Sequence, residues 1–393
     1  MEKIFVGIDV AKQTHWACAM DAGGRIVLDR AVENDPEAIE GFVAELHALE
    51  GEAVIGLDVV GSVARFLEAM LLGEGFALVH TPGIAVNRAG QGFAGGERKS
   101  DPGDARTIAD LVRTRPLRPV LPDDDTLVAL RLKVARRREL VAEQTRRLCR
   151  LRQLLGGIHP GLERALDVTC KGPLALLARH VTPAEIRRAG RKRLIAHLRK
   201  TPHLRGVEAL ADAALAAAAA QRIVVPGEAA TAEMIREMAV EALETRARLA
   251  RLDRDLEALL ERHPDGALIQ SLPGVGAILA AELLAHLGNI ARFPSADALA
   301  STAGLAPVLR QSGKARGWRR ARGGDKALKR IFFQSAFCAV RAGDPLSKAY
   351  YDRKRREGKT HTQALIALAR RRVTVLWTML RNHEAFDRDR KAA

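Results

Sequence analysis

The sequence is poor in cysteine and in aromatic residues. It has four cysteines in 393 residues, widely spaced and without a C-x-x-C pair, which argues against a disulfide scaffold or a cysteine zinc site and for a reducing compartment. Aromatic residues make up 4%, too few for an open sheet that stacks single-stranded bases. No run of eighteen apolar residues and no secretory signal is present. We therefore expect a cytoplasmic protein that is not associated with a membrane.

Positive charge is what the chain has in excess. Lys and Arg total 63 against 47 Asp and Glu, a formal net charge of +16. Such an excess points to nucleic acid as the partner, and double-stranded DNA is the form we expect. The length is enough for two or three domains with substantial cores.

The first 122 residues alternate short apolar runs with amphipathic segments. Apolar runs at 4–10, 53–59 and 76–82 predict buried strands, and residues 14–32 predict two more strands in a meander. Helices are expected at 36–49, at 62–75 and after residue 100. The order βββαβαβα, with mixed strand directions, is the ribonuclease-H-like arrangement, so residues 1–122 are predicted to form an α/β domain of that type.

The remainder of the chain is predicted to be helical. Pro116, Pro119 and Pro122 indicate a linker. Residues 123–263 are predicted to form a coiled-coil region with an inserted arginine-rich segment at 156–230. Residues 264–393 are predicted to form a basic, helical C-terminal domain. The two long helices, at 126–155 and 231–263, are expected to pair antiparallel or to mediate dimerisation. Their expected seam residues are Val134, Val141, Leu148 and Leu155 in the first helix and Leu249, Leu252, Leu256 and Leu259 in the second.

Four aspartates stand at positions where an α/β domain gathers ligands. Asp9 and Asp58 end apolar strands, and Asp101 and Asp104 open a helix on one face. Helix capping is the alternative, with Asp101 as the N-cap before Pro102. Carboxylates that converge on one point suit Mg²⁺ or Mn²⁺, and two such ions suit phosphodiester chemistry. We favour the metal site, with capping as a compatible second role of Asp101.

Residues 310–330 are a dense basic segment with nine Lys or Arg against one Asp. Ser312 lies on a glycine-bearing turn within it and could attack a phosphate whose charge the arginines stabilise. No histidine base is visible nearby, and a solvated basic loop is the alternative reading. The cations expected to bind nucleic acid are Lys99, Lys314, Arg316, Arg319, Arg320 and Arg322.

The stretch SLPGVGAILAAELLAHLG, residues 271–288, has the pattern of a helix–hairpin–helix motif. In such a motif the backbone N–H groups near Gly274 and Gly276 hold DNA phosphates without reading sequence. An ordinary helical hairpin is the alternative.

Two sets of segments, in this order, resemble the DEDD transposases of insertion sequences. These enzymes are related to the Piv DNA invertase and include bridge-RNA-guided recombinases. The resemblance covers about residues 1–120 and 265–385. It is carried by FVGIDVAKQTHWACAMD, LDVVGSVARFLEAMLLGEGFALVHTP and KSDPGDARTIADL, and then by LPGVGAILAAELLAHLGNIARFPSADALASTAGLAPVLRQSGKARG.

The resemblance implies a RuvC-like metal site and a catalytic serine, Ser312. It also implies a transposase that cuts and rejoins double-stranded DNA, a structured non-coding (bridge) RNA as a partner, and a homodimer or homotetramer. The family's second acid is usually Glu, and here it is Asp58, one methylene shorter. A structure-selective nuclease of the Holliday-resolvase type and a non-catalytic nucleic-acid-binding protein remain the alternatives. The implied metal ligands are Asp9, Asp58, Asp101 and Asp104.

Overall fold

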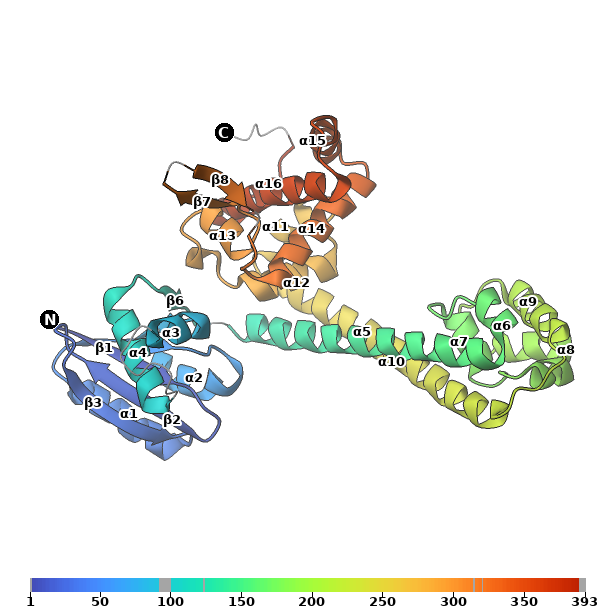
Figure 1. Ribbon diagram of the computed structural model, residues 1–393, viewed down its shortest axis with the longest axis horizontal. Helices are drawn as coiled ribbons and strands as arrows, with labels where there is room; N and C mark the ends of the chain where they lie inside the picture. Colours follow the sequence, from blue (N-terminus) through green and yellow to red (C-terminus); the bar gives the residue numbers. More distant parts are fainter. Residues whose placement is uncertain (1, 92–99, 123, 314, 320, 389–393) are drawn as a thin grey trace. The chain divides into compact units, whose positions relative to one another are not determined.

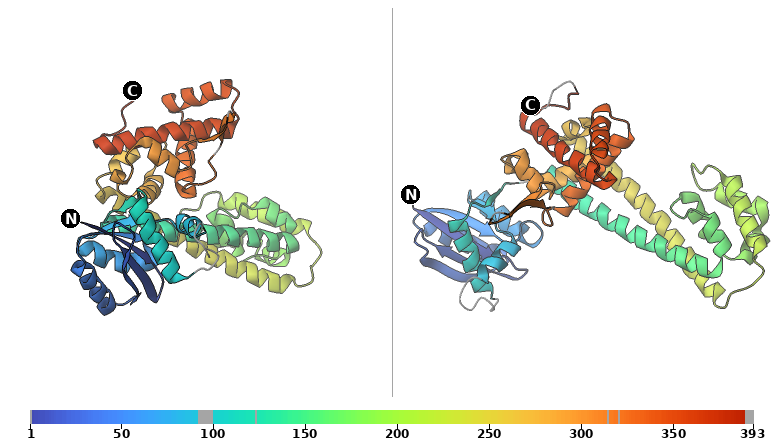
Figure 2. Two further views of the ribbon diagram at one scale, coloured as in Figure 1. Left: turned by 60° about the vertical axis from the view of Figure 1, so that its left-hand side comes forward. Right: turned by 45° about the horizontal axis from the view of Figure 1, so that its top comes forward.

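The computed structural model describes residues 2–91, 100–122, 124–313, 315–319 and 321–388. The chain forms two compact units (Figures 1 and 2). One comprises residues 1–124 and 288–294, and the other comprises residues 125–287 and 295–393. Among the described residues, none of the helices has the length and apolar character to cross a membrane.

The first unit is built on a six-stranded mixed sheet in the order β3-β2-β1-β4-β5-β6. The central strands β1, β4 and β5 are parallel, while β2, β3 and β6 join by antiparallel pairing. This mixed α/β architecture is consistent with the predicted ribonuclease-H-like arrangement. The strands are β1 (Lys3–Asp9), β2 (Thr14–Met20), β3 (Ile26–Glu33), β4 (Glu52–Leu57), β5 (Ala77–His80) and β6 (Arg118–Val120).

Helices cover both faces of this sheet. Phe42 of α1 and Leu67 of α2 pack with Val6 and Ile8 on one face. Ile108 of α4 and Val86 of α3 pack with Phe5 on the other. The helices are α1 (Pro36–Ala48), α2 (Arg65–Gly73), α3 (Gly83–Gly90) and α4 (Asp101–Thr114), with a short 3₁₀ turn η1 (Ser62–Ala64).

Two elements of this unit differ from the sequence prediction. The proline-bearing segment expected to be a linker contains β6, which pairs with β5 and makes the edge of the sheet. An edge strand tolerates Pro119, because one side of it needs no hydrogen-bond donor. Helix α3 was not predicted, since its eight residues contain too few apolar positions to show a period.

Helix α4 lies very close to β1 at Gly7. A Cβ built on Gly7 would stand 2.2 Å from the carbonyl oxygen of Ala105 and 2.2 Å from the nitrogen of Ala109. Only a residue without a side chain permits this approach. Gly7 therefore fixes the distance between β1 and the helix that carries Asp101 and Asp104.

Gly7→Ala should destabilise the first unit by about 1–3 kcal/mol, because backbone atoms of α4 must move to admit the methyl group. Chemical denaturation of the full chain, followed by fluorescence and circular dichroism, measures this loss. Gly41→Ala is the matched control: Gly41 lies within α1 with open space around its Cβ position. That substitution should stabilise the helix by about 0.5–1 kcal/mol. Equal effects of the two substitutions would contradict the packing argument.

The second unit contains two long helices, α5 (Asp125–Ile158) and α10 (Glu228–Arg262), which run side by side (Figure 1). Lys133 pairs with Asp255 at 2.7 Å, and Arg147 pairs with Glu241 at 2.9 Å. The residue numbers of these pairs rise along α5 as they fall along α10, so the two helices are antiparallel.

The contacts between these helices differ from the expected seam at Val141. Val141 is 40% exposed, while Leu140 and Gln144 are buried. The Gln144 side chain donates to the carbonyl oxygen of Ala242 at 3.0 Å. A buried side-chain hydrogen bond to the partner helix thus replaces an apolar contact here.

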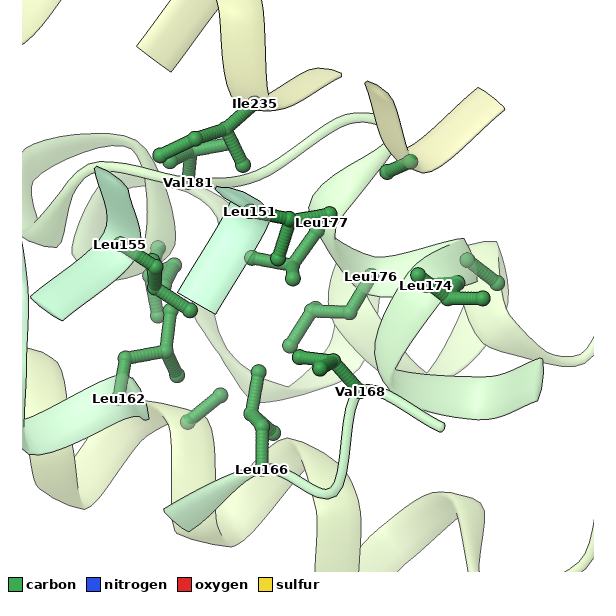
Figure 3. Packing of buried hydrophobic residues seen from close by; sticks show 14 of the residues in the cluster. Leu151, Leu155, Leu162, Leu166, Val168, Leu174, Leu176, Leu177, Val181 and Ile235 are labelled. Carbon is green, nitrogen blue, oxygen red and sulfur yellow. The ribbon is translucent and has the colours of Figure 1, made fainter. Parts of the chain in front are cut away.

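Residues 156–230, which run from the last turn of α5 to the first turn of α10, form a compact helical module that we call the insert module. Its apolar core closes against the ends of the two long helices, with Leu151, Leu155 and Ile235 meeting Leu162, Leu176 and other module residues (Figure 3). The module therefore shares one packed core with the adjoining ends of α5 and α10. Its helices are α6 (Pro160–Ala165), α7 (Lys171–Leu177), α8 (Pro183–Leu198) and α9 (Val207–Ala220).

The C-terminal part is helical, as predicted, except for one β-hairpin that the sequence analysis missed. The hairpin pairs β7 (Val308–Ser312) with β8 (Ala315–Arg319). Buried Arg372 holds the loop before α12 by donating to the carbonyl oxygen of Pro273 and to Ser335 Oγ. The helices are α11 (Gly266–Ser271), α12 (Ala277–Leu287), α13 (Ala296–Thr302), α14 (Lys326–Arg341), α15 (Pro345–Arg356) and α16 (His361–Asn382), and the 3₁₀ turn η2 (Ile290–Arg292) belongs to the first unit.

Candidate functional site

Two of the four aspartates lie together at the carboxyl ends of the central parallel strands, which we call the site edge of the sheet. Asp9 is the last residue of β1, and Asp58 directly follows β4, which is the parallel neighbour of β1. Both are half-buried. The backbone N–H of Val10 donates to Asp58 Oδ1 at 3.1 Å, so the Asp58 carboxylate is tied to the strand end that carries Asp9.

Helix α4 begins at the same edge. Ala105 lies over Gly7, and Arg113 at the far end of α4 donates to the carbonyl oxygen of Ala22, near the start of β1. The helix therefore runs opposite to β1. Asp101 and Asp104 stand in its first turn, where the positive end of the helix dipole favours carboxylates.

The capping role predicted for Asp101 is wrong. The N-cap of α4 is Ser100, whose Oγ accepts from the N–H of Gly103 at 3.3 Å. Asp101 is the first helical residue, Pro102 the second, and Asp101 is exposed. Because the serine already supplies the cap, the Asp101 carboxylate is not needed for it.

Oxygen ligands are what this edge offers to a cation. The donor type suits Mg²⁺ or Mn²⁺. The ends of β1 and β4 and the start of α4 place the four aspartates toward the carboxyl end of the parallel strands. Within the described parts of the chain, no group of three or more His, Cys, Asp or Glu side chains is close enough to hold a metal ion. The four-aspartate site stays a prediction.

Two residues near this edge were missed by the sequence analysis. His80 ends β5 as Asp9 ends β1, and this shared position at a strand end could have revealed it. Burial lowers the pKa of His80 and so favours the neutral imidazole, although a hydrogen bond with the Asp58 backbone opposes the shift. Glu68 of α2 accepts from the N–H of Gly61 at 2.6 Å and holds the loop that follows Asp58. No spacing in the sequence indicates that contact.

Ser312 ends β7 in the second unit. It lies opposite Ala315 in the hairpin, directly before Gly313, whose φ of 56° is the left-handed conformation that a tight turn requires. Every residue of β7 is exposed, and so is Trp318 of β8, at 63%. The hydroxyl of Ser312 therefore stands on a projecting, solvent-accessible hairpin.

A basic groove of about 1030 Å³ lies beside this hairpin. Among the described residues its lining has no carboxylate, so it suits an anionic chain. Arg316 lies on β8 opposite Gln311, outside the lining. The predicted contacts at Lys99, Lys314 and Arg320 fall outside the described residues. The cations of the groove are Arg310, Arg319, Arg322, Lys326 and Lys329.

The glycines of the predicted helix–hairpin–helix motif lie in the loop between α11 and α12. Gly274 has a φ of 77°, and a Cβ there would stand 2.4 Å from the backbone nitrogen of Ala339 in α14. Packing of the loop on α14 thus accounts for this glycine. Gly276 is exposed, with open space around it, so its phosphate contact stays a prediction.

Comparison with known proteins gives matches over nearly the whole chain. Residues 6–160 match a family model described as a transposase, and residues 266–352 match the model of the IS116/IS110/IS902 transposase family. The 44.8 kDa protein of insertion element IS116 from Streptomyces clavuligerus is 38% identical, over 98% of this chain and 96% of that protein.

Two further relatives extend the comparison. The 42 kDa protein of insertion element IS900 from Mycobacterium paratuberculosis is 39% identical, over 98% of this chain and 97% of that protein. The pilin gene-inverting protein of Moraxella bovis is 30% identical, over 36% of this chain and 45% of that protein.

Proposed function

This chain belongs to the IS116/IS110/IS902 family of transposases, and on that premise we propose that it cuts and rejoins double-stranded DNA with an aspartate-held metal and Ser312 as the nucleophile. The family identifies an enzyme of DNA strand transfer, which confirms the resemblance seen in the sequence. The observation that carries the finer proposal is the exposed hairpin that presents Ser312 beside a groove lined by cations.

The metal in this proposal is Mg²⁺ or Mn²⁺, held by Asp9, Asp58, Asp101 and Asp104. A divalent ion held there would polarise the phosphate and stabilise the negative charge that develops in the reaction. The hydrogen bond from the Val10 N–H keeps the Asp58 carboxylate near the end of β1. His80, whose pKa burial lowers, could accept a proton at the same end of the strands.

Ser312 would act by transesterification. Its Oγ attacks the phosphorus and forms a serine–phosphate ester, while the bond from phosphorus to one deoxyribose oxygen breaks. That oxygen leaves as a hydroxyl after it takes up the proton lost by the serine. A deoxyribose hydroxyl of a second DNA end then attacks the same phosphorus and displaces Oγ, which regains a proton. No phosphodiester is lost to water, so the DNA is rejoined without an external energy source.

The remaining elements have matching roles in the proposal. The groove cations would hold the DNA backbone through charge, and the α11–α12 hairpin would add contacts from backbone N–H groups near Gly276. The antiparallel pair of α5 and α10 would act as a coiled coil that helps to join subunits. A homodimer or homotetramer follows from the need to bring several cut ends together, and a structured RNA of the element is the partner proposed to choose the sites.

The test is a joining reaction with purified full-length protein. The DNA carries the segments that flank the gene, with the flanking non-coding RNA supplied in one arm. We expect joined product in Mg²⁺ or Mn²⁺, loss of product in excess EDTA, and recovery when metal is returned. Joined product that persists in EDTA would contradict the metal. Cleaved, unjoined ends would favour the nuclease of the Holliday-resolvase type, and binding without cleavage would favour the non-catalytic protein.

A further inference from the structure

The insert module carries more positive charge than its fold needs. Residues 156–230 contain twelve Lys or Arg against six Asp or Glu, and no Phe, Trp or Tyr. Residues 161–265 lie between the two segments that match family models, so the module falls outside both matches except for its first residues, 156–160. Its core is made of Leu, Ile, Val and Ala side chains and does not use the cations.

The acids around α8 already have cationic partners. Arg191 donates to both carboxylate oxygens of Asp212, at 2.7 and 3.0 Å, and this lowers the pKa of Asp212. Arg199 pairs with Glu208 at 2.6 Å. Glu185 completes a capping box at the start of α8 and pairs with Arg236. Little negative charge is therefore left near α8 to balance its other cations.

Three of those cations lie on the last part of α8 or directly after it. Leu194 and Leu198 are buried in the core, and at 100° per residue the opposite side of the helix carries Lys192 and Arg193. Lys200 follows in the turn after the helix ends at Leu198. All three are exposed. Within the described part of the chain, none of them has an acidic partner. We call Lys192, Arg193 and Lys200 the α8 basic face.

Local stability does not explain this face. Gly190 has non-helical angles, φ 66° and ψ 167°, so a new helical segment starts at residue 191. Cations in the first turn of a helix are unfavourable, because the helix dipole is positive there. Lys192 and Arg193 stand in that turn. Their mutual repulsion and the dipole both favour an anion that binds from outside the chain.

We propose that the α8 basic face binds the phosphate backbone of duplex DNA that flanks the exchange site. The inference goes beyond the proposed chemistry but takes its choice of DNA from it. The module has no Phe, Tyr or Trp to stack on unpaired bases, which favours a duplex over RNA loops and single strands. Exposed Lys and Arg on a helix face suit evenly spaced phosphates, which they hold without reading sequence.

The two long helices separate the proposed contact from the C-terminal helices. Helices α5 and α10 have 34 and 35 residues. At 1.5 Å per residue each is roughly 50 Å long. The module stands at one end of the pair, and α12 packs against the helices near the other, where Arg131 donates to the carbonyl oxygen of Ala285 at 2.9 Å. The module would therefore add a separate DNA contact to that of the groove beside Ser312.

The test compares two full-length variants with equal charge loss. Lys192→Gln, Arg193→Gln and Lys200→Gln together remove the face, while Arg164→Gln, Arg179→Gln and Arg222→Gln remove three other exposed cations of the module. Affinity for a 60-base-pair duplex is measured from low to physiological salt. Each lost phosphate contact lowers the slope of log K against log salt by about 0.9, so the face variant should lose up to about 2.7.

The control variant should keep its slope within about 1 of the wild-type value. An unchanged slope in the face variant, or an equal loss in both variants, would overturn the proposal. So would a loss seen only with a duplex RNA probe, since the partner would then be RNA. Thermal unfolding and circular dichroism show whether both variants fold.

A second measurement does not depend on the variants. DNA that carries photoreactive phosphates should crosslink to the wild-type peptide that contains residues 192–200, and absence of that crosslink would also overturn the proposal. This outcome is separate from the chemistry: a chain that never joins DNA but loses salt slope in the face variant would refute the proposed function and leave the α8 contact standing.

Discussion

Ser312→Ala should abolish the covalent protein–DNA adduct and lower strand joining by at least about 10³-fold, as loss of an enzyme nucleophile does. DNA affinity should change by less than about twofold, because a hydroxyl on an exposed hairpin contributes little to backbone binding next to the groove cations. The reaction is stopped with denaturant, and protein that stays joined to labelled DNA is counted by gel and mass spectrometry.

The hairpin geometry indicates that Ser312→Ala leaves the fold of the hairpin unchanged. Ser312 is exposed at the end of β7, so its removal leaves no cavity, and the turn depends on the left-handed Gly313 instead. Ser301→Ala is the matched control, since Ser301 is an exposed serine of the same unit, in α13. That variant should form adduct at the wild-type level. Adduct that survives in Ser312→Ala would refute the nucleophile.

The sequence predicted the strands of the first unit well because they are buried apolar runs between clear turn signals. Val6 and Ile8 in β1, and Ile55 and Leu57 in β4, are 1% exposed or less. Elements without that signal were missed. Strand β6 has three residues, one of them proline, and the hairpin strands are exposed along β7 and rich in arginine, so no apolar alternation marks them.

The positions of Asp9 and Asp58 at strand ends were predictable from the sequence, but the loop contacts around them were not. Asp9 and Asp58 follow from the rule that ligands gather where parallel strands end. The Ser100 cap and the contact of Glu68 with Gly61 depend on loop conformations that composition does not encode. Asp9 and Ser312 belong to separate compact units, so spacing along the chain carries no information about the distance between them.

Asp101→Asn should abolish strand joining and adduct formation while DNA binding stays within about twofold of wild type. The amide is nearly isosteric but removes one negative charge from a site that must balance a divalent ion, and the Ser100 cap keeps α4 intact. Gel assays of joining and adduct measure the first effect, and titration with labelled duplex measures binding.

Metal binding provides a readout that does not depend on activity. If the aspartates hold Mn²⁺, a concentration of 100 times Kd raises the free energy of unfolding by about 2.7 kcal/mol, seen as a higher Tm of the wild-type chain. Asp101→Asn should lose most of that shift. Asp110→Asn is the matched control, because Asp110 lies on the same helix and pairs with Arg113 at 2.6 Å, an interaction worth about 0–1 kcal/mol. It should keep both the metal shift and strand joining. A variant at 101 that joins DNA at the wild-type rate with an unchanged Mn²⁺ shift would remove Asp101 from the site and leave at most three carboxylates to hold the metal.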